Sequence, residues 1–128
     1  METLEQFIAK HRKSDEKRSD FAEYLYSLMS ARGIDKPSQV YLKANITKQA
    51  SSAIIAGKVS PSLNTCVKLA FALKTTNHEC KYLFKKAGYT LASSSEYALI
   101  IRYCIENGIY DIYALNDYLE KYGYAPIV

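Results

Sequence analysis

The polar residues in the stretch from Thr47 to Ala56 can contact the edges of DNA bases, provided that this stretch forms a helix. Gln49 can bond bidentately to adenine, and Lys48 can reach the acceptors of guanine or a phosphate. Ser52 can bond either type of base, and Ala50 or Ala53 can contact the methyl group of thymine. The stretch contains neither arginine nor asparagine, so its side chains suit either a weak sequence preference or packing against another protein.

The chain contains no residue pattern that is typical of an enzyme active site. There is no glycine-rich phosphate loop, no histidine and carboxylate paired near a nucleophile, and no metal-ligand spacing. The whole chain has only two histidines, which disfavours general acid–base catalysis. Cys66, Cys80 and Cys104 are widely spaced within helical apolar patterns, which is typical of buried free thiols in a reducing compartment. We therefore expect no catalytic residue, no cofactor and no metal site.

The positive charge of the chain is concentrated in its middle. Between Lys36 and Ala87 there are nine lysines and one acidic residue, Glu79. Before this segment acidic residues slightly outnumber basic ones, and after it five acidic residues face two basic ones. Such a distribution is expected of a protein that binds the phosphate backbone of nucleic acid. The alternative is a lysine-rich surface that serves only solubility.

Two short helices and a tight turn would have to position the polar side chains. Asn45 tolerates the left-handed backbone that a sharp turn between helices requires. Thr47 is placed to cap the second helix, and Gly57 suits the position just after its end. The apolar residues at helical spacing are Val40 and Ala44 in the first helix, Ile54 and Ile55 in the second, and Ile46 between them. This layout predicts a helix-turn-helix, whose second helix lies in the major groove of DNA.

The residues after this second helix resemble those of a known family. They are the run GKVSPSL from Gly57 to Leu63, followed by Thr65, Val67, Leu69, Ala70 and Leu73. The pattern resembles the lambda-repressor-like (Xre-type) helix-turn-helix proteins, in which a glycine follows the recognition helix and a proline–serine pair opens the fourth helix. The resemblance covers roughly residues 21–88 and implies a small bacterial member with a five-helix DNA-binding domain. Tyr41 and Ser51 depart from the family pattern, which has a small residue and a buried aliphatic residue at these positions.

The resemblance also implies contacts with phosphate at the start of the second helix of the domain. Many relatives have a glutamine there, whereas this chain has Pro37, so Ser38 or Gln39 would take that role. In the loop before the fourth helix, Lys58 and Ser60 lie close to the amides of a helix N-terminus, which can bind phosphate. The predicted DNA-binding residues are therefore Ser38, Gln39, Thr47, Lys48, Gln49, Ser52, Ala53, Lys58 and Ser60.

The chain as a whole predicts one all-α domain spanning residues 1–128. Residues 1–18 form an N-terminal arm or helix, residues 19–88 the five-helix core, and residues 89–128 an extension with two further helices. The predicted caps are Ser19 or Asp20 for the first core helix, Ser62 for the fourth, the pair Thr76 and Glu79 for the fifth, and the pair Ser93 and Glu96 and then Asp111 in the extension.

The two ends of the chain suggest association between molecules. Apolar residues cover almost the whole circumference of the helix between residues 97 and 105, which predicts burial on two sides. Eight of the twelve tyrosines follow Gly88, and tyrosine suits interfaces. At the N-terminus, Leu4, Phe7, Ile8 and His11 share one helical face that must dock on the extension or on a second copy. These helices could build a homodimer, or they could cap the core of a monomer.

The function that these patterns favour is DNA binding by a transcription regulator without enzymatic activity. Its partner would be double-stranded DNA, read in the major groove by the helix at residues 47–56. No apolar run approaches the roughly 20 residues of a membrane span, and the N-terminus lacks the apolar segment of a signal peptide, so we expect a cytoplasmic location. The alternative is a protein-interaction module, for example an antitoxin-like partner of another protein, that uses the same fold without specific DNA binding.

Overall fold

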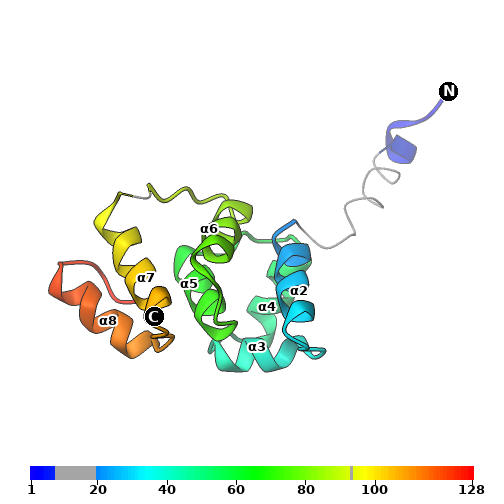
Figure 1. Cartoon of the computed structure of the whole chain (residues 1–128). Coiled ribbons are helices and arrows are strands. Elements are labelled where there is room, and N and C mark those ends of the chain that lie inside the picture. Colours follow the sequence, from blue (N-terminus) through cyan, green and yellow to red (C-terminus); the bar gives the residue numbers. More distant parts are fainter. Residues whose placement is uncertain (8–19, 93) are drawn as a thin grey trace.

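The computed structural model describes residues 1–7, 20–92 and 94–128, and the secondary structure in these ranges is helical, with no strand (Figure 1). The helices are α2 (Asp20–Ala31), α3 (Pro37–Lys43), α4 (Lys48–Ile55), α5 (Leu63–Ala72), α6 (Asn77–Lys86), α7 (Glu96–Glu106) and α8 (Ile112–Lys121). Residues 4–7 form a further helical turn. The predicted all-α class is confirmed.

Helices α5 and α6 form the centre of the bundle (Figure 1). Helices α2, α3 and α4 lie on one side of this pair and the α7–α8 pair on the other. Helix α6 packs against α2, α5 and α7, so it joins the two sides. The buried side chains form one continuous cluster, whose fully buried members include Leu25, Phe71, Leu83, Leu115 and Leu119. Burial of this apolar surface is the main force that holds the short helices together, since each is marginal alone.

Local capping sets most helix boundaries where the sequence predicts them. Thr47, Ser62 and Asp111 accept hydrogen bonds from the first-turn amides of α4, α5 and α8, and Thr76 with Glu79 forms the expected capping box. The capping box of Ser93 and Glu96 is wrong, because the side chain of Ser95 caps α7 by accepting from the amide of Ala98. Ser93 lies outside the described residues, as does Ser19, while Asp20 is the first residue of α2.

The structure corrects one expectation about apolar side chains and leaves two others open. The apolar pattern of the fifth core helix predicts that Tyr82, Leu83 and Ala87 face the core, but Tyr82 is 40% exposed and packs on the surface between Tyr24 and Lys86. Within the single chain α7 is buried on one side, and Leu99 and Tyr103 on its outer side are exposed, so burial of a second side stays a prediction that requires a partner. At the N-terminus Leu4 and Phe7 are also exposed, whereas Ile8 and His11 lie outside the described residues.

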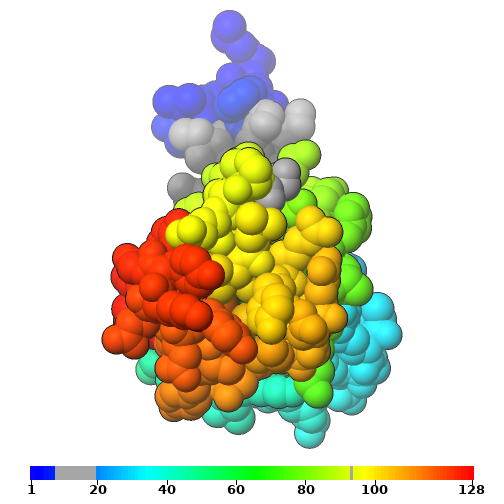
Figure 2. Space-filling view, turned by 60° about the vertical axis from the view of Figure 1, so that its left-hand side comes forward, coloured from blue at the N-terminus to red at the C-terminus, as the bar shows by residue number. Residues whose placement is uncertain are grey.

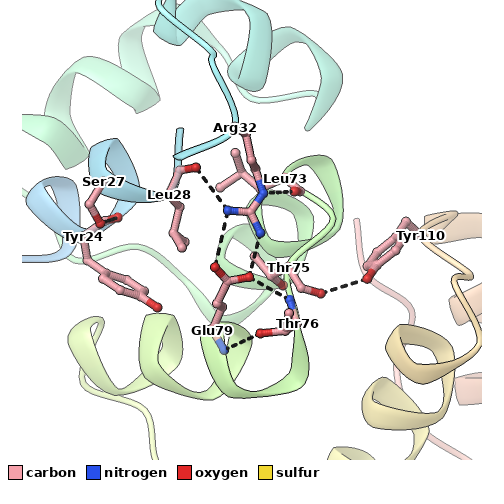
Figure 3. A network of polar contacts seen from close by, with 9 residues as sticks. All are labelled: Tyr24, Ser27, Leu28, Arg32, Leu73, Thr75, Thr76, Glu79 and Tyr110. Atoms are coloured by element: carbon pink, nitrogen blue, oxygen red, sulfur yellow. Dashed lines mark hydrogen bonds and ion pairs between the residues drawn. The ribbon is translucent and has the colours of Figure 1, made fainter. Parts of the chain in front are cut away.

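A polar network joins the end of α2 to the turn between α5 and α6 (Figure 3). The guanidinium of Arg32 donates to the carboxylate of Glu79, with 2.6 Å between Nη2 and Oε1, and its Nε donates to the carbonyl oxygen of Leu73 at 2.6 Å. The next residues of the turn continue the connection toward the extension, since the hydroxyl of Tyr110 donates to the carbonyl oxygen of Thr75 at 2.9 Å. The network therefore holds the end of α2, the start of α6 and the segment just before α8 around one turn.

Candidate functional site

A tight turn of four residues, from Ala44 to Thr47, joins α3 to α4 and determines the angle between them. Ala44 ends α3, and Asn45 follows with a φ of +57°, in the left-handed region that asparagine tolerates. The amide of Ile46 donates to the carbonyl oxygen of Tyr41 at 2.9 Å, which closes the turn. The hydroxyl of Thr47 then accepts from the amide of Ala50 at 3.1 Å and starts α4. The predicted roles of Asn45 and Thr47 are confirmed.

Helix α4 has one buried side and one exposed side. Ser51 and Ile54, which are 3% and 7% exposed, face the core. Lys48 and Ser52 form one row at four-residue spacing and Gln49 and Ala53 the next, on the side of the helix turned away from Ser51 and Ile54. Lys48, Gln49 and Ser52 are exposed accordingly, and Ala53 is half-buried beside them.

The exposed residues of α4 line one open hollow of about 630 Å³. Its lining consists of Lys48, Gln49, Ser52, Ala53, Ala56 and Lys58. The structure thus brings together the residues that the sequence suggested as base readers and one of the two predicted loop contacts. Ala56, which was missed, follows Ser52 and Ala53 by four and three residues, so helical spacing alone would have added it.

The remaining predicted residues lie outside this hollow. Ser38 and Gln39 are exposed on α3. The hydroxyl of Thr47 is engaged in capping α4. Ser60 is exposed in the following loop, where it lines a separate crevice of about 120 Å³ at the start of α2. These four residues can border a ligand bound to α4, but they do not share its hollow.

The loop after α4 is held in a defined position. Gly57 has a φ of +74°, and the amide of Lys58 donates back to the carbonyl oxygen of Ala53 at 3.0 Å, which places the Lys58 side chain beside the end of α4. Further along, Pro61 is buried and its carbonyl oxygen accepts from the hydroxyl of Tyr89 at 3.0 Å. Sequence reasoning missed Tyr89, because 28 residues separate the two partners.

The electrostatics of the middle segment favour an anionic partner. Lys36, Lys43, Lys48, Lys58 and Lys74 are all exposed there. The one acidic residue of the segment, Glu79, is turned into the network with Arg32, so it does not neutralise these lysines. Partial burial acts to raise the pKa of the Glu79 carboxyl, but hydrogen bonds from Arg32 and Thr76 outweigh it, and the net effect lowers the pKa. The surface around α3 and α4 therefore stays positive at neutral pH.

The two departures from the family pattern both face the interior. Ser51 donates its hydroxyl to the carbonyl oxygen of Lys48 at 2.9 Å, so a polar group replaces an aliphatic one without losing its hydrogen bond. Tyr41 is 9% exposed and belongs to the core cluster. Burial, together with the neighbouring Tyr26, raises the pKa of the Tyr41 phenol. Both positions are thus buried.

The cysteines do not form a chemical site. Cys66, Cys80 and Cys104 are buried free thiols. Burial, with a smaller contribution from Cys80, raises the pKa of Cys66 to about 12, and burial raises that of Cys80 to about 12. These two thiols are protonated at neutral pH and are poor nucleophiles and metal ligands. Within the described ranges, no group of three or more His, Cys, Asp or Glu residues could hold a metal ion.

None of the helices in the described part of the chain has both the length and the apolar character to cross a membrane. Comparisons of the chain with protein-family models, with curated proteins and with solved structures returned no match.

Proposed function

We propose that α3, the turn at Asn45 and α4 form a helix-turn-helix of the lambda-repressor-like type, and that the chain binds double-stranded DNA. In this proposal it is a cytoplasmic transcription regulator without enzymatic activity. Helix α4 enters the major groove, and the positive surface around it contacts the phosphates.

One observation carries this proposal. The side of α4 that bears Lys48, Gln49 and Ser52 is exposed, while Ser51 and Ile54 on the opposite side anchor the helix to the core. A recognition helix requires this division, because base edges can be reached only by side chains that the rest of the molecule does not cover. The open hollow along these residues leaves room for a nucleic acid.

Each side chain has a distinct expected role. Gln49 bonds to adenine in the groove, and Lys48 bonds to guanine or to the adjacent phosphate. Ser52 and Ala53 contact bases near the middle of the helix, where a hydroxyl and a methyl group give only modest discrimination. Lys58, fixed at the end of α4, contacts a phosphate and positions the helix without reading sequence.

A salt titration on random-sequence duplex DNA tests the proposal. Binding should weaken steeply with salt, with a slope of log K against log salt of about −4 to −6, because each neutralised phosphate contributes about −0.9. A variant that lacks two of the positive charges, Lys48→Ala with Lys58→Ala, should make the slope less steep by about two. A chain that binds no duplex even at low salt would refute the proposal.

A second function is favoured by the small side chains of α4. Besides Lys48 and Gln49, the outward residues of this helix are alanine and serine, which allow close approach of a protein surface. In this alternative the same fold binds a protein, as an antitoxin-like partner does, and DNA binding is absent. The salt titration separates the two, because only the DNA-binding function produces a steep salt dependence with random duplex.

A further inference from the structure

Helices α7 and α8 form an antiparallel hairpin at the edge of the bundle. The rings of Tyr103 and Tyr118 meet edge to face, with 5.6 Å between centroids, and those of Tyr97 and Tyr124 do the same at 5.4 Å. Because the start of α7 is paired with the chain just after α8, and the later part of α7 with the middle of α8, the two helices run in opposite directions. Their ends at Glu96 and Lys121 therefore lie at the same end of the hairpin.

The outer side of this hairpin carries a continuous apolar groove, which we name the outer groove. Its volume is about 450 Å³, and its lining comprises Glu96, Leu99, Ile100, Tyr103, Tyr118, Lys121 and Tyr122. Leu99, Tyr103 and Tyr122 are exposed by 46%, 51% and 53%. On each helix the lining residues recur three or four positions apart, so they form one stripe per helix. In Figure 2 the two helices lie side by side on the face turned toward the viewer.

The outer groove is not needed to attach the hairpin to the bundle. Attachment uses the opposite sides of the two helices, where Ile101, Cys104, Leu115 and Leu119 are at most 3% exposed. A helix pair with a second, exposed stripe of leucine and tyrosine is unusual for a solvent-facing surface, and contiguous apolar patches of this kind mark interaction sites. Tyrosine in particular is enriched at such interfaces.

We propose that the outer groove binds the outer groove of a second copy of this chain. The two hairpins would pack into a four-helix bundle, with α7 of one copy against α8 of the other. The charges of the groove favour this occupant. Glu96 on α7 and Lys121 on α8 lie at the same end, so a two-fold axis along the hairpin places Glu96 opposite Lys121 of the second copy, twice per dimer.

This inference stands without the proposed DNA binding. The α7–α8 hairpin lies on the far side of α5 and α6 from α4 in Figure 1. The outer groove on this hairpin shares no residue with the hollow on α4. A dimer formed here leaves both copies of α4 uncovered by the interface. If the chain also binds DNA, the dimer would carry two recognition helices and bind two half-sites.

The first test measures the molecular mass of the full chain by sedimentation equilibrium at concentrations from about 1 to 200 micromolar. A dimer with a micromolar dissociation constant is detectable in this range. The expected result is a concentration-dependent rise to twice the 14.5 kDa of one chain. Tyr103→Ser should weaken dimerisation by about tenfold or more, as the loss of a central aromatic anchor does. The matched control is Tyr113→Ser, which removes an 83% exposed tyrosine of α8 that does not line the groove, and it should leave the dimer unchanged. Circular dichroism verifies that both variants fold.

The second test addresses the two-fold arrangement itself. Glu96→Lys and Lys121→Glu should each weaken the dimer, because each places like charges opposite one another. The double variant, which exchanges the two charges, should restore the wild-type association. A wild-type chain that remains monomeric throughout the range overturns the proposal. Equal dimerisation by the wild type and Tyr103→Ser overturns it as well, and failure of the double variant to recover overturns the two-fold arrangement.

Discussion

Arg32 and Glu79, which are 47 residues apart in the sequence, form a part-buried ion pair with 2.6 Å between Nη2 and Oε1. Each partner also makes hydrogen bonds to other groups. Arg32 donates to the carbonyl oxygens of Leu28 and Leu73, and Glu79 accepts from the amide of Thr76. The pair therefore joins the C-terminal turn of α2 to the capping box of α6. A pair embedded in such a network contributes more than an isolated surface pair, because its loss leaves several polar groups without partners.

Replacing Arg32 should destabilise the fold markedly. Arg32→Met keeps the aliphatic part of the side chain but leaves the carboxylate of Glu79 and the carbonyl oxygen of Leu73 without their donor. We expect a loss of about 2–3 kcal/mol in the free energy of unfolding, measured by urea titration. The control is Arg102→Met, whose pair with Glu106 is about half-exposed and lies within one helix, so its loss should cost about 0.3–0.5 kcal/mol. Equal losses in the two variants would contradict the structural role of Arg32.

The same carboxylate should make stability depend on pH in the acid range. The pKa of Glu79 is lower in the folded chain than its ordinary value of 4.5, so the folded state favours the charged form. The stability from this group is present above the ordinary pKa and is lost as the pH falls through the lower, folded value. Urea titrations of the wild type and Glu79→Gln between pH 7 and pH 3 should show a difference at neutral pH that shrinks in acid. A difference that stays constant over this range would exclude the linkage.

The two non-glycine residues with positive φ in the described ranges should respond differently to glycine. Asn45 has a φ of +57° and Lys74 a φ of +52°. Lysine pays a steric cost in this region, so Lys74→Gly should raise the free energy of unfolding by about 0.5–1 kcal/mol. Asparagine tolerates it, so Asn45→Gly should be nearly neutral, whereas Asn45→Ala should cost about 1 kcal/mol. Thermal or urea unfolding measures all three, and a neutral Asn45→Ala would argue against the left-handed turn.

Local chemistry explains why much of this architecture was predictable from the sequence. The left-handed turn at Asn45 and the caps at Thr47, Ser62 and Asp111 depend on residues within a few positions of one another. The division of α4 into a buried and an exposed side follows from helical spacing in the same way. All three of these features concern one helix or one turn, and the sequence is sufficient for them.

Features that depend on tertiary packing were not predictable. Arg32 and Glu79 are far apart in the sequence, and no local pattern indicates that they pair. The hydrogen bond from Tyr89 to the carbonyl oxygen of Pro61 likewise joins residues that are distant in the sequence. On α7 the apolar residues surround the helix, so periodicity could not tell which side docks, and the exposure of Tyr103 became evident only from the fold. The cap of α7 was misassigned because three consecutive serines offer several candidates, and only the backbone places Ser95 at the start of the helix.

Two exposed residues of the candidate site should differ in how their loss affects DNA binding. Lys58, held beside the end of α4, is expected to contact a phosphate, so Lys58→Ala should weaken binding to all duplexes alike and make the salt dependence less steep by about one. Gln49 points from α4 into the open hollow, so Gln49→Ala should change the ranking of duplex sequences, with about 1–3 kcal/mol at the affected base pair. Lys81→Ala, which removes an equal charge from the exposed surface of α6, serves as the control and should change neither property.

Selection from a random duplex pool followed by fluorescence anisotropy measures both effects. Identical behaviour of the Lys58 and Gln49 variants would mean that α4 does not read the groove with this face, since a phosphate contact is blind to sequence and a base contact is not.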